Sequence, residues 1–296
     1  GVVLPPPPPL AGGFAPADLS PQDVANFTPD EISDFTPGQF AFLPGEAVGA
    51  LSLDQFEALD RDVFGGFQQE QIAALPKDFF SEFDPKGFEE LSQGAFAGFK
   101  PETFEALPDE FIGKVNAEQL AGLDAKVVKT FDADVIDQLS DKAFSGFTRE
   151  QFGSLPKNLI AEITPGQFSN LTADALTGLK TKSLVNFDPE IFEKLGADQI
   201  TSFNPKAFKK MDVDQIQAIA PKAFVGLTPE QGAEFNKVVV GNFNKKQIRS
   251  IQPECLASLP DPVFRLLEDD LSASQLNGLA GFVPLGDGEN IGGAVI

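Results

Sequence analysis

Three side-chain types are missing from the 296-residue chain, which contains no histidine, no tryptophan and no tyrosine. Cysteine and methionine occur once each, as Cys255 and Met211. Histidine-based catalysis, cysteine–histidine dyads and metal centres built from histidine or cysteine clusters are therefore excluded. A single cysteine also excludes an intramolecular disulfide. We predict that the protein is not an enzyme and has no catalytic residues, no cofactor and no metal site.

Positive charge is also scarce. The chain has 22 Lys and Arg against 44 Asp and Glu, which gives a formal net charge of −22 and a pI of about 4.2. Nucleic acids and anionic membrane surfaces are bound through basic surfaces, so this charge disfavours both as partners. No stretch approaches the ~18 uninterrupted apolar residues of a transmembrane helix. We therefore predict no nucleic-acid partner and no membrane span.

What the sequence contains instead is an eight-residue repeat, here called the octad. Residues spaced by eight from Leu19 to Leu259 are all apolar, and those from Val24 to Phe264 are apolar except at Gly232. Two such columns define an internal repeat array over residues 19–266. Phenylalanine, present 30 times, fills many of these positions because it buries a large area without needing a hydrogen-bond partner.

Each octad carries the signals of a helix start. Its second position holds Ser, Thr, Asp or Asn in 20 of 31 octads, and these residues cap helix N-termini. Proline often follows, at the first helical position, where its missing N–H has no intrahelical partner to lose. Helices this short are stable only when stacked on neighbours, and a heptad coiled coil fits neither the period nor the prolines. The sequence predicts an all-α solenoid of short capped helices, an elongated rod.

The fifth position of the octad alternates between two chemistries. In one set of octads it is glutamine in ten of fourteen cases, and in the interleaved set all fourteen residues are apolar. The octad is therefore interpreted as an 8-residue half-repeat within a 16-residue full repeat. We expect two octads to form one coil with a short helix on each side, of which one side is polar and glutamine-rich.

The apolar fifth-position column has two interpretations. Either this side of the coil turns further into the core, or it forms a lateral surface for a partner or a second copy, since long exposed apolar stripes are otherwise a liability. The larger members of this candidate lateral stripe are Val63, Phe79, Phe111, Val127, Leu159, Ile191 and Val239.

Four segments follow from these patterns. Residues 1–18 are Pro- and Gly-rich, residues 19–266 form the octad solenoid, residues 267–282 form a C-terminal cap where the register slips by four, and residues 283–296 form a Gly-rich apolar tail. Both ends carry apolar residues, which we predict to be head-to-tail assembly contacts between copies. These candidate contacts are Val2, Val3, Leu4, Ala294, Val295 and Ile296.

Other candidate sites have simpler interpretations. Cys255 lies in the apolar column and is expected to be a small core residue, and most acid pairs in an acidic repeat are solvated helix starts. If a discrete site exists, we expect it near Gly232 and the proline-free octad 235–242. The remaining candidates are a calcium-type loop at 286–290, acidic clusters at Asp132, Asp134 and Asp137 and at Asp212 and Asp214, and glycosylation sequons at Asn26 and Asn170.

The array resembles the Leu-Thr-x-x-Gln-apolar repeats of large microbial surface and secreted proteins, over most of the chain. This resemblance implies an extracellular structural role and supplies no site residues. We predict a non-enzymatic subunit of an extracellular filament, appendage or surface layer that assembles with itself. The alternative is a scaffold or adhesin that binds peptide or glycan ligands along its glutamine-rich face. The chain begins at Gly1 without a visible signal peptide, which indicates a processed chain or a fragment.

Overall fold

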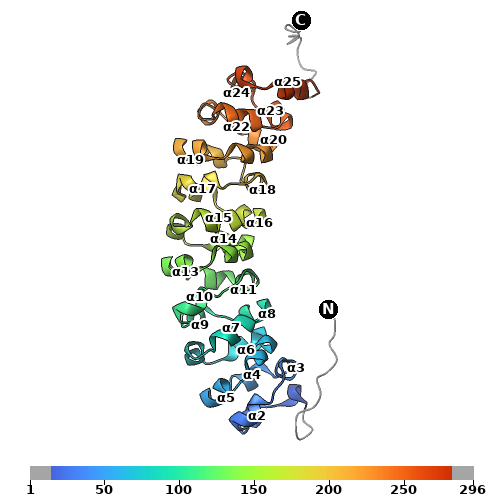
Figure 1. Ribbon diagram of the computed structural model, residues 1–296, viewed down its shortest axis with the longest axis vertical. Helices are drawn as coiled ribbons and strands as arrows, with labels where there is room; N and C mark the ends of the chain where they lie inside the picture. The colour runs from blue at the N-terminus through green and yellow to red at the C-terminus, as the bar shows by residue number, and fades with distance from the viewer. Residues whose placement is uncertain (1–14, 282–296) are drawn as a thin grey trace. The chain divides into compact units, whose positions relative to one another are not determined.

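The computed structural model describes residues 15–281, which form short α-helices and 3-10 helices and no strand (Figure 1). The predicted all-α solenoid of short capped helices is confirmed. The chain divides into two compact units, one ending at Ile191 and the other beginning at Phe192, and helix α17 (Pro189–Glu193) contains the boundary.

The helices have the following bounds. In the first unit they are η1 (Pro16–Asp18), α1 (Pro21–Ala25), α2 (Pro29–Ser33), α3 (Pro37–Phe40), α4 (Gly45–Val48), α5 (Leu53–Glu57), η2 (Arg61–Gly66), α6 (Gln69–Ala74), η3 (Lys77–Ser81), α7 (Pro85–Glu90), α8 (Gln93–Phe96), α9 (Pro101–Phe104), α10 (Asp109–Ile112), α11 (Ala117–Gly122), α12 (Ala125–Val128), α13 (Ala133–Gln138), η4 (Asp141–Gly146), α14 (Arg149–Ser154), η5 (Lys157–Glu162), α15 (Pro165–Asn170), α16 (Ala173–Thr177) and η6 (Thr181–Asn186). In the second unit they are α18 (Ala197–Thr201), η7 (Ala207–Lys210), α19 (Val213–Ala218), η8 (Pro221–Gly226), α20 (Pro229–Ala233), α21 (Lys237–Val240), α22 (Lys245–Ser250), α23 (Pro253–Ala257), α24 (Asp261–Phe264), η9 (Glu268–Asp270) and α25 (Ala273–Leu279).

Each octad forms one short helix followed by an extended joint. In the octad 147–154, the Thr148 hydroxyl accepts a hydrogen bond from the backbone N–H of Gln151 and so caps α14. The helix ends at Leu155, whose φ of −53° and ψ of 137° are extended. Because the joint is extended and the next cap follows at once, the chain changes direction after every octad.

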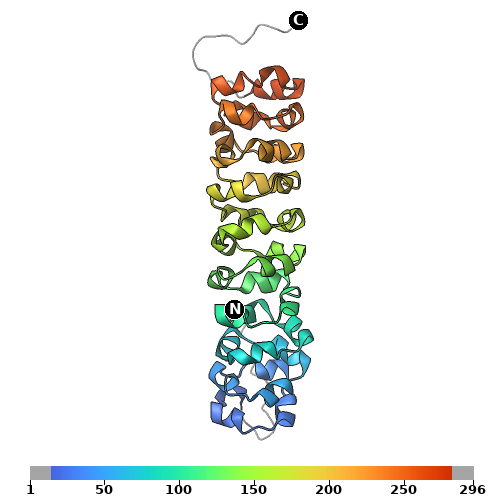
Figure 2. The same cartoon turned by 90° about the vertical axis from the view of Figure 1, so that its left-hand side faces the viewer.

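Three octads, rather than the expected two, complete one turn of the solenoid. Helices that pack on each other begin three octads apart, as α11, η4 and α15 do in the first unit, with first residues Ala117, Asp141 and Pro165. The stack of α18, η8 and α22 in the second unit has the same spacing, and the turns of residues 192–281 are visible as successive layers in Figure 2. The coil of two octads with a helix on each side is therefore corrected to a turn of three helices.

A turn of three octads changes the meaning of the two-octad alternation. Because three is odd, each octad of the glutamine set packs on an octad of the apolar set in the neighbouring turn. Thus α11, α15 and α22, which carry glutamine, stack on the 3-10 helices η4 and η8, which carry alanine at the same position. In these stacks the two chemistries are complementary rather than segregated to two sides of the coil.

The core lies inside the turns. The two apolar columns of the octad are buried with few exceptions, and many Phe rings contact each other between neighbouring octads. Among the exceptions are Phe27, Leu179 and Phe264, which are half-buried. The C-terminal segment continues the array, because η9 packs on α22 and α25 packs on α23.

Candidate functional site

The glutamine column consists of Gln39, Gln55, Gln71, Gln119, Gln151, Gln167, Gln199, Gln215, Gln231 and Gln247, and all ten side chains are buried. This finding corrects the prediction of a polar, glutamine-rich face, because there is no exposed row of amides for a peptide or glycan to contact. A buried amide must be fully hydrogen-bonded to be tolerated.

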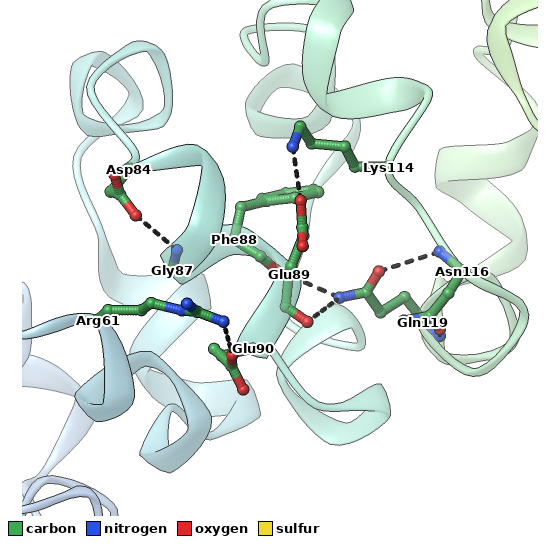
Figure 3. A network of polar contacts seen from close by, with 9 residues as sticks. All are labelled: Arg61, Asp84, Gly87, Phe88, Glu89, Glu90, Lys114, Asn116 and Gln119. Atoms are coloured by element: carbon green, nitrogen blue, oxygen red, sulfur yellow. Dashed lines mark hydrogen bonds and ion pairs between the residues drawn. The ribbon is translucent and has the colours of Figure 1, made fainter.

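Figure 3 shows how one member of the column meets this requirement. The Gln119 side-chain oxygen accepts a hydrogen bond of 3.1 Å from the backbone N–H of Asn116, at the start of its own helix. Its Nε2 donates to the carbonyls of Phe88 and Leu91 at 3.2 and 3.0 Å, with a longer contact to Glu89. The amide therefore links the N-terminus of one helix to the C-terminal end of a helix in the preceding turn.

The same bonding repeats along the chain. Gln71 donates to the carbonyls of Phe40 and Leu43, and Gln231 donates to those of Ile200 and Phe203, always 31 and 28 residues earlier. These acceptors lie where short helices end. The carbonyls of Phe40 and Ile200 also accept the backbone N–H of the residue three positions later, whereas those of Leu43 and Phe203 belong to the joint after the helix, where the last carbonyls need partners from outside it. The last described helix adds a further member, because Gln275 of α25 donates to Ile248 and Ile251, 27 and 24 residues earlier. The changed spacing records the predicted slip in register.

The candidate lateral stripe is also corrected. Its side chains are all buried within the chain, so they are core residues and do not form a surface. They are Val63, Phe79, Phe111, Val127, Leu159, Ile191 and Val239. The alternative interpretation, in which the apolar set turns further into the core, is the one that the structure bears out. In a turn of three octads all three helices face one interior, so the turn has no separate apolar side.

Ion pairs supplement the glutamines on the outside of the turns. Lys114 Nζ lies 2.5 Å from Glu89 Oε1, and Arg61 Nη2 lies at the same distance from Glu90 Oε1 (Figure 3). The hydrogen bond from Lys114 lowers the pKa of the Glu89 carboxyl below its usual value. All four side chains are substantially exposed, so each pair contributes little to stability.

Cys255 is a buried core residue, as predicted. Burial raises the pKa of its thiol to about 12, although a hydrogen bond from the Gly232 backbone opposes this shift. Gly232 itself faces Cys255, because a Cβ atom at that position would lie 2.9 Å from the sulfur and 2.7 Å from the Cys255 carbonyl oxygen. The missing apolar anchor therefore has a packing explanation and does not open a cavity. In the neighbouring proline-free octad, Val238 is 74% exposed.

Two of the acidic candidates act as helix caps, and Asp134 and Asp214 lie in the first turns of the helices that they cap. Asp132 accepts a hydrogen bond from the backbone N–H of Val135, and Asp212 accepts one from that of Gln215. Across residues 15–281, no group of three or more carboxylates or thiols is placed to hold a metal ion. The predicted terminal contacts Val2, Val3, Leu4, Ala294, Val295 and Ile296, and the loop at 286–290, lie outside the described residues.

One feature that the sequence analysis missed is the uneven distribution of charge. No Lys or Arg precedes Arg61 in the sequence, whereas the segment 206–249 contains eight of these cations against four acids. A count of charges along the chain would have detected this difference. The grouping of these charges on stacked helices depends on the three-octad turn.

Within residues 15–281, no helix has both the length and the apolar character needed to cross a membrane. In comparisons with known proteins, no family model and no curated protein matches the chain. The fold and the glutamine column together define an α-solenoid repeat protein with glutamine-linked turns.

Proposed function

We propose that the protein is a non-enzymatic structural subunit of an extracellular or cell-surface filament, appendage or layer. The observation that carries this proposal is the glutamine column, in which buried amides join the starts of helices such as α6 and α14 to backbone carbonyls of the preceding turn. Such bonds resist separation of the turns, which is the property that a load-bearing element needs. The resemblance to repeats of large microbial surface and secreted proteins supports the extracellular location.

Assembly is proposed to be head-to-tail, through the apolar terminal segments 1–13 and 283–296. In a solenoid, each terminal turn exposes the surface on which a further turn would stack. In the last part of the described array, Leu266 and Leu276 are 52% and 50% exposed, which supports a contact at that end. Head-to-tail contacts between identical chains are heterologous and propagate into open filaments unless the rotation closes a ring.

Truncation tests this proposal. The intact protein is expected to form filaments or sheets in electron micrographs, with an assembled fraction that rises with concentration. Deleting residues 1–13 or 283–296 is expected to abolish assembly while the circular dichroism spectrum stays helical. Filaments from both truncated forms at the concentration of the intact chain would contradict the end-to-end contacts.

The alternative function, a scaffold for peptides or glycans, loses the surface on which it was predicted. The glutamine amides are buried, and those of Gln71, Gln151 and Gln231 are engaged in contacts between turns. We therefore retain only the structural role as the proposed function.

A further inference from the structure

Two pairs of stacked helices carry opposite charge. In the second unit, η8 and α22 pack on each other and expose Lys222, Lys245, Lys246 and Arg249, here called the basic surface. Neither helix contains an acid. In the first unit, α2 and α5 pack on each other and expose Asp30, Asp34, Asp54 and Glu57, with Asp34 directly after α2; this group is here called the acidic surface.

The basic surface retains charge that its own unit does not neutralise. Lys245 lies 2.8 Å from a carboxylate oxygen of Asp270, and Arg249 donates to the Asp270 backbone carbonyl. A further acid, Asp198, lies on α18, which packs on η8. The ion pairs found among residues 15–281 involve neither Lys222 nor Lys246. Two exposed ammonium groups, one on each helix, therefore have no ion pair in the described structure.

The acidic surface matches this arrangement in spacing. Asp30 and Asp54 hold the fourth position of octads that lie one turn apart, as Lys222 and Lys246 do. In both helix pairs the second helix begins three octads after the first. None of the four acids takes part in an ion pair among residues 15–281. The two carboxylates thus hold the same octad positions on one surface, one turn apart, as the two ammonium groups hold on the other.

Each surface also carries one exposed large apolar side chain. Leu53, on α5, is 38% exposed, and Val225, on η8, is 48% exposed. Few large apolar side chains are exposed among residues 15–281, so the presence of one on each surface is notable. An exposed apolar residue that shares its helices with charges of one sign can form the centre of a protein contact whose rim is polar.

We propose that the acidic surface of one copy binds the basic surface of a second copy, with Leu53 packed near Val225. The contact is heterologous, so every copy offers one surface of each sign to its neighbours. This inference rests on the proposed function in taking the partner to be a second copy, but it places the contact on the flanks of the solenoid rather than at its ends. Since both surfaces are solvent-exposed, the attraction is screened by salt.

Charge reversal tests the contact. The acid-reversed variant Asp30→Lys/Asp54→Lys and the base-reversed variant Lys222→Glu/Lys246→Glu are each expected to weaken self-association about tenfold or more at low salt, measured by sedimentation velocity. An equimolar mixture of the two variants is expected to regain association, because the reversed surfaces are again opposite in charge.

Matched controls occupy equivalent positions. Glu46→Lys/Glu70→Lys changes two exposed fourth-position acids that are also one turn apart, on the stacked helices α4 and α6. Lys126→Glu/Lys142→Glu changes two exposed fourth-position lysines elsewhere in the first unit. Both controls are expected to associate as the unchanged protein does. Equal weakening by controls and test variants, or no recovery in the mixture, would overturn the proposal.

A disulfide trap gives a second, independent readout. Mixing Leu53→Cys and Val225→Cys chains under mild oxidation is expected to give a covalent dimer on a non-reducing gel, and the buried Cys255 is expected not to react. The control pair is Leu53→Cys with Val185→Cys, because Val185 is 52% exposed at the same octad position on η6. Equal dimer yields from both pairs would overturn the proposed contact.

The outcomes separate this inference from the proposed function. Loss of filaments after terminal deletion, with no effect of charge reversal and no specific dimer, overturns the flank contact and leaves the structural role standing. A specific dimer with filaments that persist after terminal deletion contradicts the end-to-end contacts but supports the flank contact. If the chain remains monomeric in both assays and binds dextran sulfate through Lys222 and Lys246, the proposed contact between copies is overturned. The partner of the basic surface is then a polyanion.

Discussion

At the scale of single residues, the glutamine column shows how a polar side chain becomes part of an apolar core. The amide of glutamine is both an acceptor and a donor, and in this fold it bonds backbone groups at the start of one short helix and at the end of another. Gln151 is 2% exposed, accepts from Thr148, and donates to the carbonyls of Leu120 and Leu123. Replacement by an apolar residue would take the glutamine bond from all three groups, and only the Leu120 carbonyl would keep another partner, the backbone N–H of Leu123.

The first prediction concerns this side chain. Gln151→Ala is expected to lower the free energy of unfolding by about 3 kcal/mol, because each buried group that loses its partner costs roughly 1–3 kcal/mol. That loss approaches the ~3–5 kcal/mol expected for the core anchor Phe152→Ala. Glu150→Ala, on the exposed neighbour, is the control and is expected to change stability by less than ~0.5 kcal/mol. Urea denaturation measures all three. A Gln151→Ala variant as stable as the Glu150→Ala control would show that the amide bonds do not contribute.

The second prediction concerns the only thiol. The pKa of Cys255 is raised to about 12 by burial, so the thiolate is disfavoured at every pH below that value. Native protein at pH 8 is expected to react with a thiol reagent at least ~100-fold more slowly than the urea-unfolded chain, in which the pKa returns to its ordinary value. Absorbance of the released chromophore follows the reaction. Rapid labelling of the folded protein would mean that the thiol is accessible and is not packed against Gly232 as described.

At the scale of elements, the octad owes its form to its two ends. A cap and often a proline start the helix, and the extended joint ends it before a third turn can form. Close approach between turns then restricts the last position of some octads to glycine. A Cβ atom on Gly146, the last residue of η4, would lie 1.9 Å from the backbone oxygen of Ala117 in the preceding turn.

The third prediction uses this close approach. Gly146→Ala is expected to destabilise the protein by about 1–3 kcal/mol, because neighbouring backbones must move apart to admit the methyl group. Gly38→Ala in α3 is the matched control, since nothing lies within 4 Å of its added Cβ. Alanine favours the helix there, so the control is expected to be neutral or to stabilise by up to ~1 kcal/mol. Thermal unfolding compares the two, and equal melting temperatures would contradict the close packing of η4 on α11.

At the scale of the whole molecule, two periods coexist. The sequence alternates with a period of two octads, whereas one turn takes three octads, so glutamine octads such as those of α11, α15 and α22 pack on apolar octads. Removing two octads keeps this pairing for every remaining interface. Removing three octads, which is one whole turn, stacks octads of the same set on each other across the new junction.

The fourth prediction separates the two periods. Deleting residues 115–130, two octads, is expected to leave a helical protein that unfolds cooperatively. Deleting residues 115–138, a complete turn, is expected to lower the melting temperature further, because octads of each set then stack on octads of the same set at the new junction. Circular dichroism during heating gives both values. A three-octad deletion at least as stable as the two-octad deletion would show that the alternation between turns has no energetic role.

The sequence by itself determined the elements of this protein. Two apolar columns, the caps and the prolines are local signals, and they located the helices and the array, because capping and burial act within a few residues. Cys255 was placed in the core for the same reason. The charge on each octad was also readable, although it was not counted along the chain.

Only the tertiary structure decided how many octads make a turn. That number depends on the angle between consecutive helices at each joint. The angle results from small differences in φ and ψ over several residues, and no residue pattern specifies them. Burial of the glutamines and of the apolar stripe Val63, Phe79, Phe111, Val127, Leu159, Ile191 and Val239 followed from it, because three helices around one interior leave no separate polar or apolar side. The three-octad turn also places Asp30 near Asp54 in register, and Lys222 near Lys246, on stacked helices. Equivalent positions of every third octad become neighbours only when the turn closes after three octads.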